Sequence, residues 1–245
     1  MRRELDKRLK EILAPHGFIK VRNFYIRLIN DIVQTVAFIY TPSYTQGCHV
    51  YYLNFGMASI YDHLIFGIIE DTYGYLSGTY TVDMHDFCCS IQNKKRTYPK
   101  DYNDDSQFEE FNEFCLPFLN SVNTLEDLYD ARIVMQTILN KNIRYHLSPD
   151  TNLCLKIGKY DKASKRISAA YNYYGEVIQE RNWPHYNDLF SNAEKLKRLI
   201  ELGDKSLIEV YLENEKEKNL ELLNSILPKR KRKTENKKTG NGNMS

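Results

Sequence analysis

Residues 18–40 read FIKVRNFYIRLINDIVQTVAFIY, two β-forming runs separated by the turn pair Asn30-Asp31. The first run alternates apolar and polar residues from Phe24 to Leu28, which predicts a strand with one buried and one polar face. The second run, residues 32–40, has apolar residues at both odd-numbered and even-numbered positions, which predicts a central strand covered on both faces. Such a hairpin indicates an antiparallel sheet.

Both flanks extend this pattern. Upstream, apolar residues recur at helical spacing from Leu5 to Leu13 and then meet Pro15 and Gly17, which predicts a short amphipathic helix. Downstream, residues 48–55 are rich in aromatic residues, which favour strands. Three consecutive strands with short connections predict an antiparallel meander.

The middle of the chain carries weaker signals. Alternation at residues 73–82 and near residues 87–91 allows further strands, whereas residues 93–106 are polar and predict an exposed loop. A helical apolar stripe follows, and Pro117 is expected to bend its end. The stripe consists of Phe108, Phe111, Cys115 and Phe118.

Strand signals disappear from about Thr124 onward. Thr124, followed by acidic Glu126 and Asp127, predicts a helix start because its hydroxyl can accept hydrogen bonds from backbone N–H groups. Further helices are predicted over residues 161–180, 187–202 and 204–227, with breaks at Gly158, at Trp183-Pro184 and at Gly203.

These elements predict an α+β fold: an antiparallel sheet of four or more strands with an N-terminal helix and flanking helices, followed by a C-terminal helical segment. The predicted organisation is an α+β domain over residues 1–123 and a helical segment packed on or beside it over residues 124–227. Residues 228–245 have almost no apolar side chains and are expected to form a disordered basic tail.

The basic character of the chain is confined to this tail. The 245 residues carry 34 basic and 32 acidic side chains, a net charge of +2. Without residues 228–245, 27 basic and 31 acidic residues remain, a net charge of −4. Because nonspecific affinity for nucleic acid comes from clustered Lys and Arg, this balance argues against nucleic acid as the partner. A nucleic-acid alternative depends on Lys229, Arg230, Lys231, Arg232 and Lys233.

The cysteines and the N-terminal residues indicate a reducing compartment. The five cysteines are odd in number, residues 1–14 contain no apolar leader, and no window approaches the roughly 18 apolar residues of a membrane span. We therefore expect a cytoplasmic protein with free thiols and no membrane association.

Several short elements of residues 1–130 together resemble a known family. They are Gly17-Phe18, Asn23-Phe24-Tyr25 ending in Arg27, Ile32-Val33-Gln34, Leu116-Pro117-Phe118 and Thr124-Leu125-Glu126-Asp127. Their order resembles the bacterial domain-of-unknown-function family 4304, although residues 61–90 depart from it. The resemblance implies a fold and no established activity. Residues 157–170 more weakly resemble the second helix of a tetratricopeptide repeat, but no copy recurs, which favours a packed helical hairpin.

Motifs for common chemistries are absent from the sequence. It contains no G-x-x-x-x-G-K-[ST], G-x-G-x-x-G, G-x-S-x-G or H-E-x-x-H. His85, Cys88 and Cys89 lie within five residues, but zinc sites usually need two spaced ligand pairs, so a buried strand with small thiols is the favoured interpretation. We predict no catalytic residue, metal or cofactor, and keep an enzyme near His85, Cys88 and Cys89 as an alternative.

Tyrosine is the most informative residue type, with 19 copies against 11 phenylalanines. Because Tyr and Arg are enriched at binding hot spots, we predict a protein-binding patch on the sheet. The predicted patch comprises Tyr25, Arg27, Tyr40, Tyr44, Tyr51 and Tyr52. The alternative is that these rings lie half-buried beneath the C-terminal helices.

Together these features predict a non-enzymatic protein-binding module of the bacterial cytosol, for example one that neutralises a partner protein. Two alternatives remain: the enzyme described above, and a nucleic-acid binder that uses the basic tail and the sheet aromatics.

Overall fold

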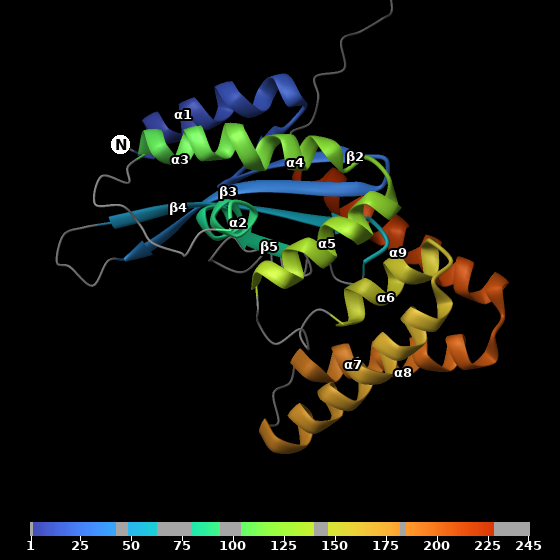
Figure 1. Cartoon of the computed structure of the whole chain (residues 1–245). Coiled ribbons are helices and arrows are strands. Elements are labelled where there is room, and N and C mark those ends of the chain that lie inside the picture. The colour runs from blue at the N-terminus through green and yellow to red at the C-terminus, as the bar shows by residue number, and fades with distance from the viewer. Residues whose placement is uncertain are drawn as a thin grey trace, which may run out of the picture.

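The computed structural model describes residues 2–42, 49–62, 80–93, 104–139, 147–181 and 185–227. Within these ranges, five strands form one antiparallel sheet in the order β1-β2-β3-β4-β5. They are β1 (Ile19–Val21), β2 (Phe24–Ile29), β3 (Ile32–Pro42), β4 (His49–Ser59) and β5 (Tyr80–Asp83). Strands adjacent in sequence are adjacent in the sheet, so the predicted meander is confirmed (Figure 1).

The β2–β3 hairpin forms where the sequence predicts it. Ile29 pairs with Ile32, and the intervening Asn30 and Asp31 both have positive φ angles, 43° and 69°. Two consecutive left-handed residues match the twist of the flanking strands, and Asn and Asp tolerate this conformation best after glycine. A second turn at Arg22, with φ of 51°, separates β1 from β2.

The helices follow the strands in two groups. The first group is α1 (Arg2–Leu13), η1 (Ala14–His16), α2 (Met84–Ile91), α3 (Asp104–Glu110), the π-helical segment η2 (Phe111–Cys115) and α4 (Leu116–Ser121). The second group is α5 (Leu125–Leu139), α6 (Leu147–Lys156), α7 (Tyr160–Arg181), α8 (His185–Leu202) and α9 (Lys205–Ile226). The predicted α+β fold with a helical C-terminal part is therefore present.

Two local predictions about the first helical group need correction. Residues 87–91, predicted as a strand, belong to α2, because the Asp83 side chain accepts from the Asp86 N–H and starts a helix. Residues 104–106, predicted as the end of an exposed loop, belong to α3. Pro117 lies just after the π-helical segment η2, within a helical run that continues from α3 into α4.

Helix starts and stops in the second group follow the predicted signals, and the predicted break at Trp183-Pro184 lies outside the described residues. Thr124 Oγ1 accepts from the Asp127 N–H, while Asp127 Oδ2 accepts from the Thr124 N–H, a reciprocal cap that confirms the predicted start of α5. Gly158 and Gly203 have φ angles of 76° and 68° next to helix ends. Helix α6, in contrast, has no counterpart in the prediction.

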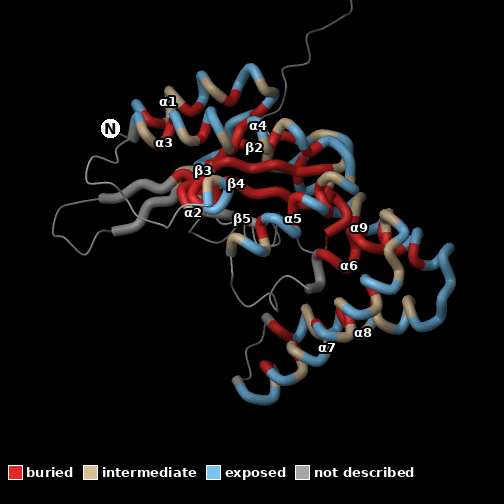
Figure 2. The backbone as a smooth tube through the Cα atoms, viewed as in Figure 1, coloured by how far each residue is buried: buried red, intermediate tan, exposed pale blue. Residues whose placement is uncertain are grey.

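The core lies on both faces of the sheet. Residues Ile32 to Val36 are all buried, which confirms β3 as a central strand covered on both faces (Figure 2). Helices α1, α3 and α4 lie along one face, whereas α7 and α8 pack together farther from the sheet (Figure 1). The buried apolar residues form one cluster that extends from Leu5 in α1 to Leu223 in α9.

Candidate functional site

The predicted sheet patch includes two residues whose side chains are described, and both are buried. Tyr25 is 2% exposed and Arg27 is 7% exposed. The expectation that this side of β2 is polar and open is therefore wrong. Tyr40 and Tyr51 are register partners and Tyr52 is paired with Ile39. Their side chains, and all of Tyr44, lie outside the described residues.

Tyr25 is buried because α1 covers it. Its hydroxyl donates to the Asp6 backbone carbonyl at 2.9 Å and to Asp6 Oδ1 at 3.0 Å. Burial, with the Asp6 carboxylate beside it, raises the pKa of the Tyr25 hydroxyl far above its usual value. The polar tip therefore attaches α1 to the sheet.

Arg27 is the centre of a polar cluster beneath α4. Its guanidinium donates to Gln34 Oε1, to the backbone carbonyls of His16 and Leu119, and to Asn120 Oδ1. Gln34 Nε2 also donates to the Leu119 carbonyl, at 2.8 Å. These donors satisfy carbonyl groups at the C-terminal end of α4, where a cation is favourable. The acceptors that Arg27 contacts among the described residues are all neutral. Desolvation by burial lowers the pKa of the Arg27 guanidinium.

His85 lies between a thiol and a carboxylate. His85 and Cys89 are one turn apart on α2, and Cys89 Sγ lies 3.4 Å from His85 Nε2. On the other side of the ring, His85 Nδ1 lies 3.1 Å from Glu110 Oε2, at the end of α3. A nucleophile, a base and an acid that can orient the base are thus in contact. Sequence spacing did not predict this arrangement, because Glu110 lies 25 residues from His85.

The remaining described thiols are more deeply buried. Cys88 Sγ and Cys115 Sγ are 3.8 Å apart in the interior, and Cys154 lies in α6. Burial raises the pKa of Cys115 and of Cys154. None of the four described cysteines forms a disulfide, and the described part of the chain has no group of three or more His, Cys, Asp or Glu side chains suited to a metal ion.

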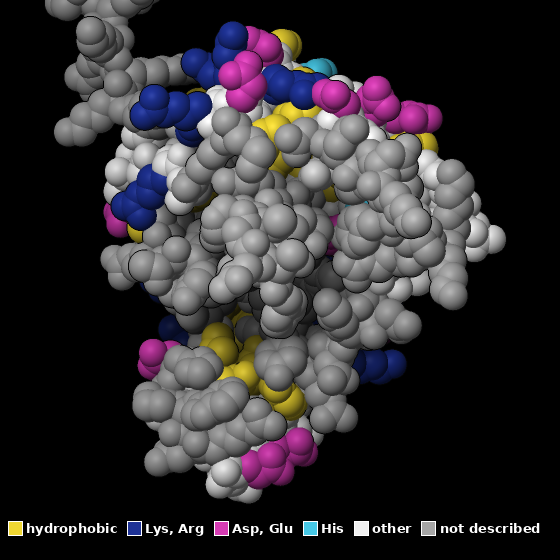
Figure 3. All heavy atoms as spheres, turned by 90° about the vertical axis from the view of Figure 1, so that its left-hand side faces the viewer, with side chains coloured by type: hydrophobic (Ala, Val, Ile, Leu, Met, Phe, Trp, Pro, Cys, Tyr) yellow, Lys and Arg dark blue, Asp and Glu magenta, His cyan; other side chains and the backbone are white. Residues whose placement is uncertain are grey.

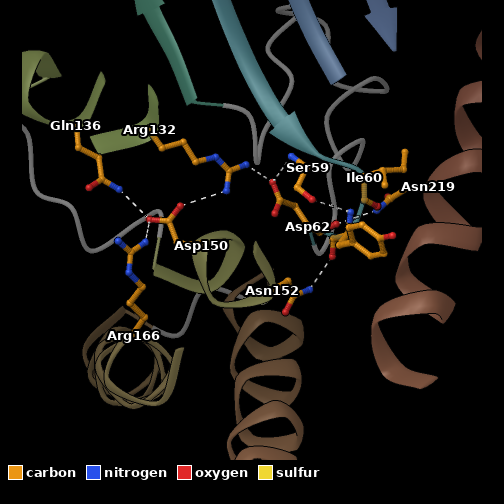
Figure 4. A network of polar contacts seen from close by, with 10 residues as sticks. Ser59, Ile60, Asp62, Arg132, Gln136, Asp150, Asn152, Arg166 and Asn219 are labelled. Atoms are coloured by element: carbon orange, nitrogen blue, oxygen red, sulfur yellow. Dashed lines mark hydrogen bonds and ion pairs between the residues drawn. The ribbon is translucent and has the colours of Figure 1, made fainter. Parts of the chain in front are cut away.

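A larger buried polar network lies at the end of β4 (Figure 4). Arg132 of α5, which is 1% exposed, forms ion pairs with Asp62 and with Asp150 of α6. Arg166 of α7 pairs with the same Asp150 carboxylate, and Gln136 donates to it at 2.8 Å. Two carboxylates and two guanidinium groups therefore compensate one another in the interior.

Amide side chains fix the backbone that carries Asp62. Asn219 Nδ2 of α9 donates to the carbonyls of Ile60 and Asp62, at 2.7 and 2.8 Å. Asn152 Nδ2 of α6 donates to the Tyr61 carbonyl at 2.7 Å. The short segment after β4 thus joins three helices, α5, α6 and α9, to the sheet, which indicates a structural role for this network.

The charge of Asp62 is nevertheless costly. Desolvation raises the pKa of this fully buried carboxyl to about 6, despite the opposing effect of Arg132. Sequence analysis missed this network because its acids and Arg132 are distant in the chain. One signal was available: Arg132 lies between Leu128 and Met135 on the buried side of α5, at helical spacing.

A groove with a mixed polar and apolar lining lies between α8 and α9, with a volume of about 360 Å³. Its apolar lining includes Leu207 and Val210, which are 46% and 58% exposed. The polar lining consists of Lys195, Asn214, Glu215, Glu217, Lys218 and Glu221. No residue of this groove was singled out from the sequence, in which Leu207 and Val210 fall within the helix predicted over residues 204–227.

The charged surface over α1 and α3 is mixed in sign. Figure 3 shows basic and acidic side chains side by side along the top of the molecule, and Arg8 of α1 pairs with Asp105 of α3. The basic tail residues 229–233 lie outside the described part of the chain. None of the described helices is long and apolar enough to cross a membrane.

Comparisons with known proteins give no relative. No family model matches the sequence, and no curated protein or solved structure is significantly similar to it.

Proposed function

We propose that this protein is a cytosolic protein-binding module whose α8–α9 groove accepts an amphipathic helix of another protein. The observation that carries this proposal is the exposed apolar part of the groove lining, Leu207 and Val210, which we call the floor and which lies among charged residues. An apolar centre with a polar rim is the usual composition of a protein interface. The proposal moves the binding surface from the sheet to the C-terminal helices.

The openness of the floor favours a macromolecule over a small ligand. Pockets for small molecules typically enclose about 70–90% of the ligand surface, which requires deep walls. Val210, at 58% exposure, lies on an open surface. An extended partner can cover such a floor, whereas a small molecule would remain largely in water.

The length of the groove favours a helix as the partner. Its lining follows α9 from Leu207 to Glu221, which at 1.5 Å per residue is about 21 Å. That length matches about four turns of a bound helix, whose apolar residues at every third or fourth position would contact the floor. Lys195 and Lys218 on the rim, with Glu217 and Glu221, suit partner residues of both charges.

Site-specific photo-crosslinking in cells tests this proposal. A photoreactive amino acid replaces Val210, and a matched control replaces Val134, which is 42% exposed on α5. We expect one defined adduct from position 210 and none from position 134. The purified adduct partner must then bind the wild-type protein in vitro, and its own activity in the presence of this protein shows whether binding neutralises it. Identical adducts from both positions, or no binding in vitro, would refute the proposal.

A further inference from the structure

The contact of Cys89, His85 and Glu110 has no part in the proposed binding function. Cys89 is 8% exposed and is the most accessible of the four described thiols, since Cys88, Cys115 and Cys154 are at most 1% exposed. We propose that Cys89 is a site of oxidation by hydrogen peroxide, with His85 and Glu110 controlling its proton.

The geometry gives His85 a clear direction for proton transfer. When Nδ1 carries the ring proton and donates to the Glu110 carboxylate at 3.1 Å, Nε2 presents its lone pair to Cys89 Sγ at 3.4 Å. The thiol proton can then move to Nε2, and the Glu110 carboxylate stabilises the resulting imidazolium. Because the thiolate is the reactive form of cysteine, this arrangement activates Cys89.

The oxidation step uses the same groups. The Cys89 thiolate attacks one peroxide oxygen, so that an S–O bond forms and the O–O bond breaks. Sulfur loses two electrons, and the peroxide is reduced by the same two. The proton held on His85 passes to the leaving hydroxide, which departs as water, and Cys89 becomes a sulfenic acid.

The limited exposure of Cys89 explains the choice of oxidant. Cys89 is 8% exposed as a whole residue and its contact with His85 is buried, so the site suits a molecule close to water in size, whereas a peptide or a sugar would need the surrounding helices to separate. Hydrogen peroxide is such a molecule. Glu110, at the end of α3, has a side chain that is 25% exposed, so the proton relay reaches the surface.

The neighbouring thiols supply an internal comparison. Cys88 and Cys115 are in contact with each other at 3.8 Å, and no imidazole contact is recorded for them among the described residues. Burial raises the pKa of Cys115, which keeps it in the unreactive thiol form. Cys154 is likewise buried, in α6, and serves as a distant reference.

The test treats the folded full-length protein with hydrogen peroxide, removes the peroxide with catalase, and then unfolds the protein in urea that contains dimedone, which traps sulfenic acid; mass spectrometry quantifies each cysteine. We expect Cys89 to be oxidised at least about tenfold faster than Cys88, Cys115 or Cys154, and we expect this preference to disappear when the peroxide is added in urea. Labelling of Cys89 no faster than that of Cys154 would overturn the proposal.

Variants separate proton control from simple packing. Glu110→Gln keeps the shape of the side chain and removes its charge, so we expect Cys89 labelling to slow several-fold, with Glu110→Asp partly restoring it. Cys154→Ala, in α6 and distant from Glu110, is the control and leaves the Cys89 rate unchanged. Circular dichroism establishes that each variant is folded. An unchanged rate in a folded Glu110→Gln variant would remove the role assigned to His85 and Glu110.

Discussion

Beneath α4, Arg27 is buried among neutral acceptors, whereas at the end of β4, Arg132 is buried between two carboxylates. The first centre uses one cation to satisfy backbone carbonyl groups of η1 and α4. The second uses four charged groups to connect the sheet to α5, α6 and α7. The comparison separates two costs of removing a buried arginine. At the first centre, hydrogen bonds would be lost; at the second, a buried carboxylate would be left without its counter-ion.

The largest effect is expected at the second centre. Arg132→Ala leaves Asp62 buried without its principal cation, and we expect the free energy of unfolding to fall by about 3–5 kcal/mol. Urea denaturation measures it. The matched control is Arg198→Ala, because Arg198 forms an exposed ion pair with Glu194 on α8 and should contribute less than about 0.5 kcal/mol. Equal effects of the two substitutions would erase the distinction between buried and surface pairs.

The two centres should also differ in their response to pH. The pKa of Asp62 is about 6 in the folded protein against an ordinary value of 3.8, so the folded state binds the proton more tightly. The stabilising contribution is therefore complete below about pH 4 and is lost as pH rises to about 6, a change of about 3 kcal/mol.

Denaturation of wild type and Asp62→Asn across this range isolates that contribution. The wild type should lose stability relative to the variant as pH rises from about 4 to about 6. Arg27→Met should keep the wild-type pH dependence, because the acceptors recorded for Arg27 are neutral. Parallel curves for wild type and Asp62→Asn would contradict the assignment.

A smaller effect is expected at the first centre. Arg27→Met removes the donor groups that Gln34, Leu119 and Asn120 accept from, and it leaves no opposite charge unpaired. The free energy of unfolding should therefore fall by about 1–3 kcal/mol. The loss should be local: hydrogen exchange should accelerate in the last turn of α4 more than in α5. Uniform acceleration through both helices would show that the Arg27 cluster supports the whole fold.

The smallest effect on stability is expected at the surface groove. Val210 is 58% exposed, so Val210→Asp should change the free energy of unfolding by less than about 0.5 kcal/mol. Thermal denaturation checks this value. A large destabilisation would mean that Val210 contributes to the core and that its exposure does not mark a binding surface.

The parts of the fold that sequence predicts are those set by local interactions. The β2–β3 hairpin follows from residue alternation and from the turn at Asn30-Asp31, and the start of α5 follows from the cap at Thr124. Residues 87–91 show the limit of this reasoning. A short apolar run suits either a strand or a helix, and the N-cap Asp83 decided in favour of α2.

The candidate sites depend on contacts that sequence spacing cannot show. Tyr25 and Arg27 carry polar tips, yet α1 and α4 bury them, the latter through residues more than 90 positions away. Glu110 lies 25 residues from His85 in the chain, and only the fold brings the two side chains into contact. The α8–α9 groove depends on how two helices pack, which their individual hydrophobic patterns do not determine.

The most direct measurement for the central claim is the affinity of the crosslinked partner for three purified proteins: wild type, Val210→Asp and the control Val134→Asp. A charge in the apolar floor should weaken binding by at least about 2 kcal/mol, roughly thirtyfold, while the control binds like the wild type. Equal affinity of Val210→Asp and wild type would contradict the account, because the partner would then bind elsewhere on this protein.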